Sequence, residues 1–549
     1  MKIRFGLVFI FLLVAVLVSC KKEKKGSLVP EPPSIPFEGK WPEIEEEKAE
    51  IGTKENPQAR RAYQRAMLVD PQTGQLPPDI RQKEMDYSAK LPSVGFSGGY
   101  LRKAGTDDWN TIGPYNVGGR TRALAIDQSN ERVVLAGGVS GGMWRSEDEA
   151  GTWTKTTVPG SIHSVTCLAQ DTRPGMTNIW YYGTGEFTSN SASKKAAPYR
   201  GDGVFKSTDG GKTWSQLLST AEGEPNRYNS QYQYIWKILP NRFQLQHDEV
   251  FLATVGAILR STDGGLTWSV VLGRKRVSNE ATDLNDANLS DYTDIVQTTD
   301  GVFYASFSSS SRSGSSPDQG IYRSTDGINW TNIAPLAWPR NYNRTVIATS
   351  STRPNELFFS VNAQQEMLWK YNYIAGDGTR QGGRWTNLSD NLPRYGGEVG
   401  DYNTQSSYNM VLMVHPSLAD VIFLGGTNLY RSTDAFASTK ATDWVGGYDT
   451  ANNIRVFANH FVDQHALAFF PSNPNKMLSS NDGGVFATNN NMTKGIAWEP
   501  RNYGFVTTQF YTLGLDEFGA KGAVMGGLQD NGTLIAKNPG VKSSWNALI

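Results

Sequence analysis

The stretch that decides the fold is Ile258-Leu259-Arg260-Ser261-Thr262-Asp263-Gly264-Gly265-Leu266-Thr267-Trp268. A close copy occupies residues 204–214, with Ser207-Thr208-Asp209-Gly210-Gly211 at its centre. In both copies the apolar pair and basic residue indicate the end of a strand, the polar centre indicates a tight turn, and Thr-Trp opens another strand. The stretch therefore predicts two antiparallel strands joined by a fixed turn.

The residue types of this turn give it a physical basis. Asp209 and Asp263 can accept hydrogen bonds from backbone N–H groups of their own turns. The glycines that follow can adopt a positive φ, and the closing Trp is expected to pack between neighbouring units. We therefore expect these aspartates to be structural.

The motif recurs along the chain. Weaker copies end at five further tryptophans, so that the series of closing residues is Trp153, Trp214, Trp268, Trp330, Trp385, Trp444 and Trp498, with spacings of 61, 54, 62, 55, 59 and 54 residues. Short strand patterns such as 123–127 and 133–138 precede the copies. A propeller blade needs about 40–50 residues, so the repeat predicts an all-β propeller of four-stranded antiparallel blades with long loops, seven or eight in number.

Composition narrows the functional classes. The 549 residues include 53 Lys+Arg and 53 Asp+Glu, and this zero net charge argues against a nucleic-acid partner. Only five His and two Cys leave little for a zinc site or a disulfide framework. We therefore expect no metal and no cofactor.

The N-terminus predicts export. Residues 1–19 have a basic start and an apolar run, typical of a signal peptide. Leu17-Val18-Ser19-Cys20 resembles the lipobox of bacterial lipoproteins, which implies lipidation at Cys20 and an anchor in the outer membrane, on either its periplasmic or its surface side. An ordinary signal peptide with an incidental Cys is the alternative. Cys167, in an apolar stretch, is expected to be an inert core thiol.

The chain divides further by composition. Residues 20–55 are predicted to be a lipid-anchored linker, 56–100 a helical stalk with helices at 56–67 and 78–90, and 101–500 the propeller. Residues 501–549 begin another unit, with an innermost strand at 509–516 and others at 523–528, 533–537 and 545–549. This unit either completes an eight-bladed ring or starts a second propeller. In the second case, which we favour, a strand near Trp109 closes a seven-bladed ring and the chain is a fragment of a longer protein.

The pattern Ser-x-Asp-x-Gly-x-Thr-Trp resembles the Asp-box, or BNR repeat, of sialidases, sortilin-type receptors and xyloglucanase-type hydrolases. Residues 109–125, 463–485 and 526–532 are also similar to secreted BNR-propeller proteins of Bacteroidota. The resemblance implies the fold more than the function, because the box is a structural turn at the blade periphery.

The resemblance also bears on catalysis. A sialidase needs an early Arg-Ile-Pro and an Arg triad; the first is absent, and Arg120 and Arg122 cannot supply the second. Xyloglucanase-type hydrolases use two Asp carboxylates across a cleft, with the base in a phrase like Asp-Val-Gly-Gly-Ala-Tyr-Arg. Here Val139 occupies the base position, and valine cannot accept a proton. Asp482 stands in a similar phrase at 481–486 and would act with an unidentified second carboxylate.

Some polar residues are not explained by a structural role in a strand or a turn. They form the candidate ligand-binding set: Arg120, Arg122, Glu186, Asp463, His465, Asp482, Gln529 and Asp530. Innermost strands and their loops line the channel of a propeller, so we expect this set at one mouth of it. The alternative is a set of ion pairs that tie blades together. A metal at Asp463, His465 and Asp482 has no ligand-spacing signature.

The sequence thus predicts a membrane-anchored binding or scaffolding propeller whose partner is an envelope protein or a glycan. The alternative is a glycoside hydrolase of the xyloglucanase-like two-propeller type that uses Asp482.

Overall fold

The computed structural model describes residues 62–90 and 111–548, with gaps at 63–64, 67, 71, 78–79, 89, 158–160, 162–163, 188–197, 222–229, 275–287, 312, 517–521, 538 and 541. Helix α2 (Ile80–Ser88) falls within the predicted second stalk helix. The predicted signal peptide, Cys20, the linker and most of the first stalk helix lie outside the described residues. No helix in the described part is both long enough and apolar enough to cross a membrane.

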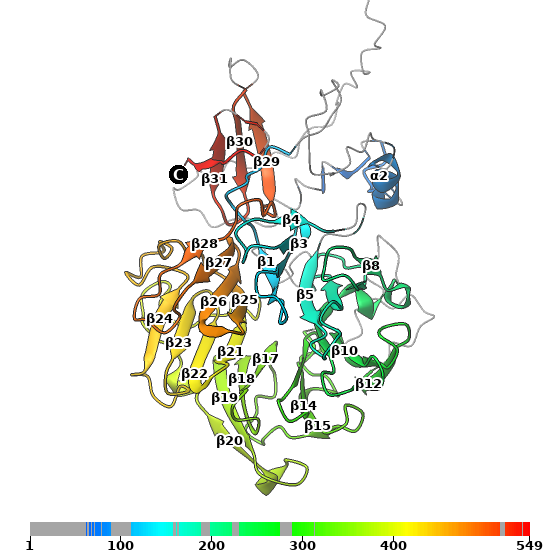
Figure 1. Cartoon of the computed structure of the whole chain (residues 1–549), viewed down its shortest axis with the longest axis vertical. Coiled ribbons are helices and arrows are strands. Elements are labelled where there is room, and N and C mark those ends of the chain that lie inside the picture. The colour runs from blue at the N-terminus through cyan, green and yellow to red at the C-terminus, as the bar shows by residue number, and fades with distance from the viewer. Residues whose placement is uncertain are drawn as a thin grey trace, which may run out of the picture. The chain divides into compact units, whose positions relative to one another are not determined.

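Eight four-stranded antiparallel sheets make up the rest, and in each the strands are hydrogen-bonded in chain order. The all-β propeller prediction is confirmed, and the first seven sheets form the ring in Figure 1. The blades of this ring are built from β1 (Thr121–Ile126), β2 (Val134–Gly138), β3 (Gly142–Ser146) and β4 (Thr154–Lys155); β5 (Val165–Gln170), β6 (Trp180–Thr184), β7 (Val204–Ser207) and β8 (Ser215–Gln216); β9 (Ile235–Pro240), β10 (Val250–Thr254), β11 (Ala257–Ser261) and β12 (Ser269–Gly273); β13 (Thr293–Gln297), β14 (Phe303–Phe307), β15 (Gly320–Ser324) and β16 (Thr331–Asn332); β17 (Thr345–Thr349), β18 (Glu356–Asn362), β19 (Glu366–Tyr373) and β20 (Gly383–Asn387); β21 (Val411–His415), β22 (Leu418–Gly425), β23 (Leu429–Ser432) and β24 (Thr442–Gly446); β25 (Gln464–Phe470), β26 (Asn473–Asn481), β27 (Gly484–Thr488) and β28 (Glu499–Pro500). The loops hold four short 3-10 helices: η1 (Leu218–Thr220), η2 (Gln231–Gln233), η3 (Arg380–Gly382) and η4 (Ser389–Asn391).

The ring closes at seven blades. The first strand of each blade is its inner strand, and each inner strand packs against the inner strand of the next blade; β1 packs against both β5 and β25. Leu124, Trp144 and Trp153 of the first blade share one buried cluster with Leu478 and Val485 of the seventh. The eighth sheet therefore does not lie between the first and seventh blades.

The closing tryptophans join each blade to the one before it, as the repeat predicted. The indole N–H of Trp214 donates to Thr156 Oγ1 of the first blade at 3.1 Å. Trp498 donates in the same way to the carbonyl of Val445 in the sixth blade at 2.8 Å. Trp153 donates to the carbonyl of Arg501 at 2.7 Å. The bond that closes the ring is thus of the same kind as those within it.

The aspartates of the repeat stabilise their own turns. Asp263 Oδ1 accepts the backbone N–H groups of Leu266 and Thr267, both at 2.9 Å, and Oδ2 accepts the Thr267 hydroxyl at 2.6 Å. Gly264 and Gly265 have φ values of 69° and 100°, which only glycine adopts without strain. The turn predicted for this repeat is therefore present, at the periphery of the blade.

The eighth sheet consists of β29 (Phe510–Leu515), β30 (Val524–Leu528), β31 (Thr533–Ala536) and β32 (Asn546–Ala547). Trp545 is buried in its core, together with partly buried Ile112 and Val117 from the segment before β1. The Trp545 indole donates to the Ile112 carbonyl at 3.0 Å, and Asn116 accepts from and donates to the Trp545 backbone at 2.8 and 2.9 Å.

The strand expected near Trp109 to close the ring lies outside the described residues, and residues 111–120 form no strand. β29, within the predicted strand 509–516, is the first strand of the eighth sheet. Residues 112–117 instead contact the eighth sheet, where they occupy the side that a preceding blade takes in the ring. Cys167, by contrast, lies buried as expected, and burial raises the pKa of its thiol to about 12.

Candidate functional site

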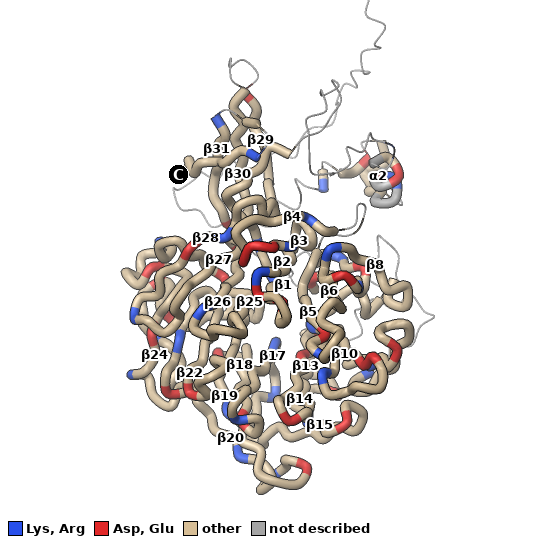
Figure 2. Tube along the Cα trace, viewed as in Figure 1, with Lys and Arg blue, Asp and Glu red and all other residues tan. Residues whose placement is uncertain are grey.

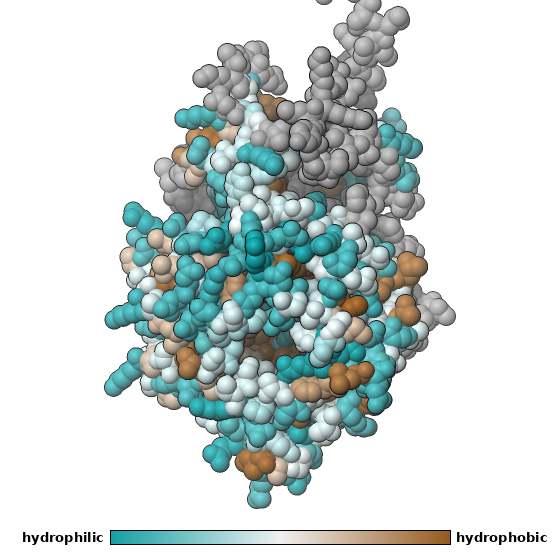
Figure 3. Space-filling view, in the orientation of Figure 1, coloured by the Kyte–Doolittle hydropathy of each residue, from teal (hydrophilic) through white to brown (hydrophobic). Residues whose placement is uncertain are grey.

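The inner strands surround a cavity of about 520 Å³, which is lined by residues of all seven blades and which we call the central channel. The face of the ring in Figure 3 is hollowed near its centre, with hydrophobic residues in the depth. Figure 2 shows charged residues of both signs gathered near the β1 and β2 labels, at the start of the first blade. The candidate residues of the sequence analysis lie at this end.

Bulges at the start of the inner strands aim side chains at the channel. The pairing of β1 with β2 skips Arg122, that of β9 with β10 skips Trp236, and that of β25 with β26 skips His465. A bulge leaves one residue unpaired and redirects its side chain. All three of these residues line the central channel.

Four residues form a buried ionic cluster around one carboxylate. Glu186 Oε1 accepts hydrogen bonds from Arg122 Nη1 at 2.8 Å and from the Tyr408 hydroxyl at 2.6 Å, and Oε2 lies 3.7 Å from Arg120 Nη1. The guanidinium groups of Arg120 and Arg122 lie 5.1 and 5.0 Å from the centre of the Tyr408 ring. The cluster joins the first, second and sixth blades.

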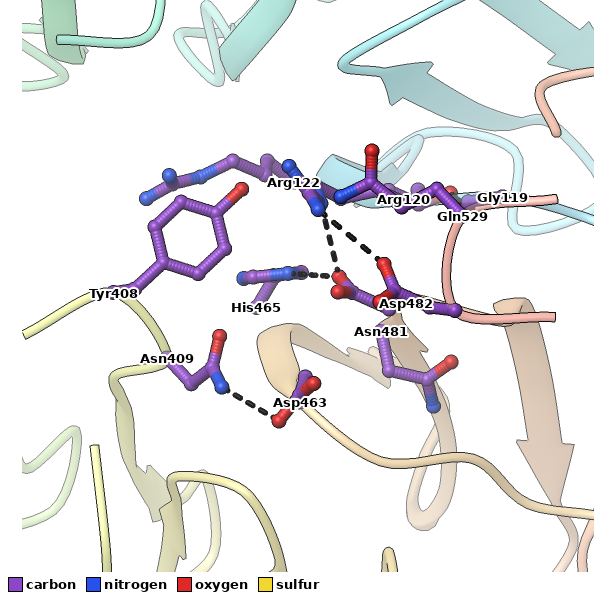
Figure 4. Close-up of polar contacts among 12 residues, drawn as sticks. Gly119, Arg120, Arg122, Tyr408, Asn409, Asp463, His465, Asn481, Asp482 and Gln529 are labelled. Atoms are coloured by element: carbon purple, nitrogen blue, oxygen red, sulfur yellow. Dashed lines mark hydrogen bonds and ion pairs between the residues drawn. The ribbon is translucent and has the colours of Figure 1, made fainter. Parts of the chain in front are cut away.

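Asp482 extends this cluster into the seventh blade and the eighth sheet. Its Oδ1 lies 2.6 Å from His465 Nε2 and 3.4 Å from Arg120 Nε (Figure 4). Arg120 Nη2 also donates to Asp530 Oδ2 at 3.3 Å, and the Asp530 carboxyl lies near enough to Asp482 for each to influence the pKa of the other. Arg120 therefore holds two carboxyl groups from two different sheets.

The two aspartates differ in access to solvent. The Asp482 side chain is fully buried in the turn between β26 and β27, whereas that of Asp530, after β30, is 33% exposed. Val139 lies in the turn between β2 and β3, the equivalent turn of the neighbouring blade, and is buried. Val139, which stands where xyloglucanase-type hydrolases have their catalytic base, thus lies at the same end of the ring as Asp482 but has no carboxyl group.

Burial shifts the titration of these groups. Burial and the neighbouring Asp482 raise the pKa of Asp530 to about 7, and burial also raises the pKa of Asp482, against the effect of Arg120. Burial, Arg122 and Arg120 lower the pKa of His465 well below its usual range, so its ring is neutral at pH 7. The cluster can therefore hold a proton on its carboxyl pair near neutral pH.

Two members of the predicted set stand apart. Asp463, at a positive φ of 66°, accepts a hydrogen bond from the Asn409 amide at 2.6 Å rather than contacting Asp482 directly, and burial raises its pKa well above the usual range. Gln529 is buried beside the cluster in Figure 4, where its backbone N–H donates to the Gln509 carbonyl at 2.9 Å. Among the described residues, no group of His, Cys, Asp or Glu is arranged to hold a metal ion.

Sequence reasoning missed four residues of this region: Trp236, Arg344, Tyr408 and Asn409. Each lies at or just before the start of an inner strand, as Arg120 and Arg122 do. This position, at the start of the first strand of each repeat, is the sequence signal that could have identified them.

The comparisons with known proteins support this fold. No known family model matches the chain. Xyloglucanases from Hypocrea jecorina (strain QM6a) and a Paenibacillus species are 28% and 27% identical over 32% and 42% of this chain, and over 24% and 22% of their own lengths. The chain thus matches about a quarter of the length of these curated relatives.

Among solved structures, the GH74 enzyme of Niastella koreensis superposes with a TM-score of 0.52 at 17% identity, covering 79% of this chain and 61% of that enzyme. At this identity the likeness concerns the fold alone. The chain is a β-propeller, and its fold is similar to that of this enzyme.

Proposed function

We propose that this protein acts on a xyloglucan-type polysaccharide as a glycoside hydrolase, with Asp530 as the proton donor and Asp482 as its neighbouring carboxyl. The two carboxyls that lie 3.4 and 3.3 Å from the Arg120 guanidinium carry the proposal. The names of the relatives and the position of Asp482 in the phrase 481–486 support it.

The pair has the chemistry of a general acid. Such an acid must carry its proton near neutral pH and reach the glycosidic oxygen. Asp530 meets both requirements, with a pKa of about 7 and a partly exposed side chain. Asp482 lies behind it and keeps that pKa high, and Arg120 stabilises the negative charge that remains after the proton leaves.

The pair does not by itself supply both catalytic groups. Glycosidases hold their two carboxyls about 5–10 Å apart across an open cleft, whereas Asp482 and Asp530 both lie against Arg120 and the Asp482 side chain is fully buried. The second carboxylate must therefore come from outside Asp482 and Asp530.

Val139 favours a second candidate function, which is binding of the same class of glycan without hydrolysis. A valine in the turn equivalent to that of Asp482 cannot act as base. In this case the cluster of charges organises a recognition surface at the junction of the ring and the eighth sheet. This candidate retains the glycan partner predicted from the sequence.

One experiment separates the two candidates. The purified chain is incubated with soluble xyloglucan, new reducing ends are measured, and affinity electrophoresis in xyloglucan gels measures binding. Hydrolysis is expected for the wild type and a loss of at least about 100-fold for Asp530→Asn, the usual range for a general acid. Glu398→Gln, an exposed carboxyl outside the cluster, serves as the matched control and should retain the wild-type rate.

Retarded migration without reducing ends would select the binding function. Neither retardation nor reducing ends would overturn both. Thermal unfolding of each variant shows whether a loss reflects the fold rather than the site.

We also propose that Cys20 carries the lipid that places the protein in a bacterial outer membrane. The motif at 17–20 supports this localisation. Cys20→Ala should move the protein from the membrane to the soluble fraction of the expressing cell, and a variant that stays with the membrane would overturn the anchor.

A further inference from the structure

The central channel carries charged groups on several inner strands, and most of them are paired. Arg122 binds Glu186 at 2.8 Å, and Lys237 Nζ lies 2.9 Å from Asp294 Oδ1. Both carboxylate oxygens of Asp294 have partners, because Oδ2 accepts a hydrogen bond from the backbone N–H of Ile347 at 2.9 Å. These pairs leave the walls near them close to neutral.

Arg344 is the exception. It stands just before β17 and lines the channel, where its Nη1 donates to the Tyr408 carbonyl at 3.2 Å. No carboxylate among the described residues lies within 4 Å of its guanidinium group. Burial lowers the pKa of Arg344 to about 10, so the group remains charged at neutral pH.

An unpaired guanidinium inside a protein is costly. Removing a cation from water is compensated only by an opposite charge or a full set of hydrogen bonds. The neighbouring Arg122 adds to the cost through repulsion, and the more distant Asp294 carboxylate offsets part of it. A channel that keeps this arrangement has one positive charge available for an anion.

An aromatic ring lies beside this charge. The centre of the Trp236 ring is 5.6 Å from the Arg344 guanidinium and 5.9 Å from that of Arg122. The Trp236 indole N–H donates to the Asp291 carbonyl at 3.0 Å, which fixes the ring orientation. Trp236 also lines the channel, whose volume of about 520 Å³ is within the range of small-molecule sites.

We propose that the central channel binds a small organic oxyanion, with its carboxylate or phosphate on Arg344 and its body against Trp236. The planar guanidinium fork matches both kinds of oxyanion. The site is separate from the proposed hydrolysis and does not depend on it.

The test is a calorimetric titration of the full chain with glucuronate, inorganic phosphate and, as the neutral probe, glucose. We expect saturable binding of glucuronate or phosphate but not of glucose. The anion that binds more tightly shows whether the channel prefers a carboxylate or a phosphate. Arg344→Gln should weaken that binding about 10- to 100-fold, since it removes a charged hydrogen bond. Arg353→Gln, an exposed arginine paired with Asp420, is the matched control and should bind as the wild type does.

Arg344→Gln should also leave the unfolding temperature unchanged or higher, because it removes an uncompensated charge. If that variant does not fold, the wild type still decides the matter: the anion that binds should protect Arg344 from phenylglyoxal, as read by peptide mass spectrometry. No binding of either anion, equal binding by Arg344→Gln, or binding without protection of Arg344 would overturn the site. Reducing-end release from xyloglucan is measured separately, so failure of one proposal leaves the other standing.

Discussion

At the scale of single residues, Arg120 connects three sheets through one guanidinium group. Glu186 follows the second strand of the second blade, Asp482 lies in the seventh blade, and Asp530 belongs to the eighth sheet. Buried charges are costly unless they are paired, and removal of one partner from such a pair costs about 3–5 kcal/mol. The network therefore fixes the relative positions of these turns as well as their protonation.

The sequence alone identifies these residues as candidates for the site, but it does not show which of them contact each other. Arg120, Glu186 and Asp482 were recognisable as polar residues without strand or turn duty. Their partners lie far away in the chain, and only the closure of the ring brings them together. Arg344 could not be recognised as a channel residue from the sequence, because a single arginine before a strand usually lies exposed on the surface.

The pH dependence of stability tests the raised pKa of Asp530. That pKa is about 7 in the folded protein and about 3.9 in an unfolded chain, so the folded state binds the proton more tightly. The contribution of Asp530 to the free energy of unfolding is therefore fully present below about pH 4 and is lost as the pH rises through about 7. Asp530→Asn stays neutral, so its unfolding temperature should rise relative to that of the wild type between pH 4 and pH 8.

Differential scanning calorimetry at pH 4, 6 and 8 measures this difference. For Glu398→Gln, the exposed control, the difference from wild type should stay flat. A flat difference for Asp530→Asn as well would show that the folded protein does not hold a proton at this position.

At the scale of elements, the repeat determines the strands and the bulges determine the site. The Trp-terminated motif predicted blades because its Asp–Gly turn and its indole each have a local physical role. The bulges that aim Arg122, Trp236 and His465 into the channel have no such signature, because they depend on pairing between strands. Asp463 and His465, two residues apart in the chain, accordingly have different partners, Asn409 and Asp482.

Asp263→Ala tests the structural role of the repeat. It removes the acceptor of two backbone N–H groups and of the Ser261 and Thr267 hydroxyls, so we expect a loss of about 1–3 kcal/mol in the free energy of unfolding. The lower end is favoured, because Leu266 and Thr267 are exposed and water can replace part of the bonding. Urea unfolding measures the change, with Glu398→Ala as the exposed control.

Xyloglucan binding by the folded Asp263→Ala protein should equal that of the wild type. Weaker binding at unchanged stability would contradict a purely structural role for this aspartate.

At the scale of the whole described part, the ring and the eighth sheet are joined by few groups. The ring closes on itself through the packing of β1 on β25 and through Trp153. The eighth sheet instead packs on residues 112–117 and meets the ring through Asp530, which accepts from Arg120, and through Asn531 and Gln509, which donate to the Asp482 carbonyl and the Tyr199 hydroxyl. The number of blades could not be decided from the repeat, because the eighth unit has the strand pattern of a blade and only the three-dimensional contacts distinguish it.

This arrangement predicts that the eighth sheet can loosen without the ring. Asn116→Ala removes both hydrogen bonds to the Trp545 backbone, which should destabilise the eighth sheet by about 1–3 kcal/mol. Amide hydrogen exchange should become faster in β29–β32 and stay unchanged in β1–β28. Asn391→Ala is the matched control, because the Asn391 amide bridges two blades of the ring through the Phe436 carbonyl, and its effect should fall on the fifth and sixth blades.

The same variant links the sheet to the site. When the eighth sheet loosens, Asp530 becomes more exposed, so its pKa should fall toward the usual range of an aspartate and the pH dependence described above should weaken. Equal acceleration of exchange in the ring and in the eighth sheet would instead show that the two unfold as one cooperative unit.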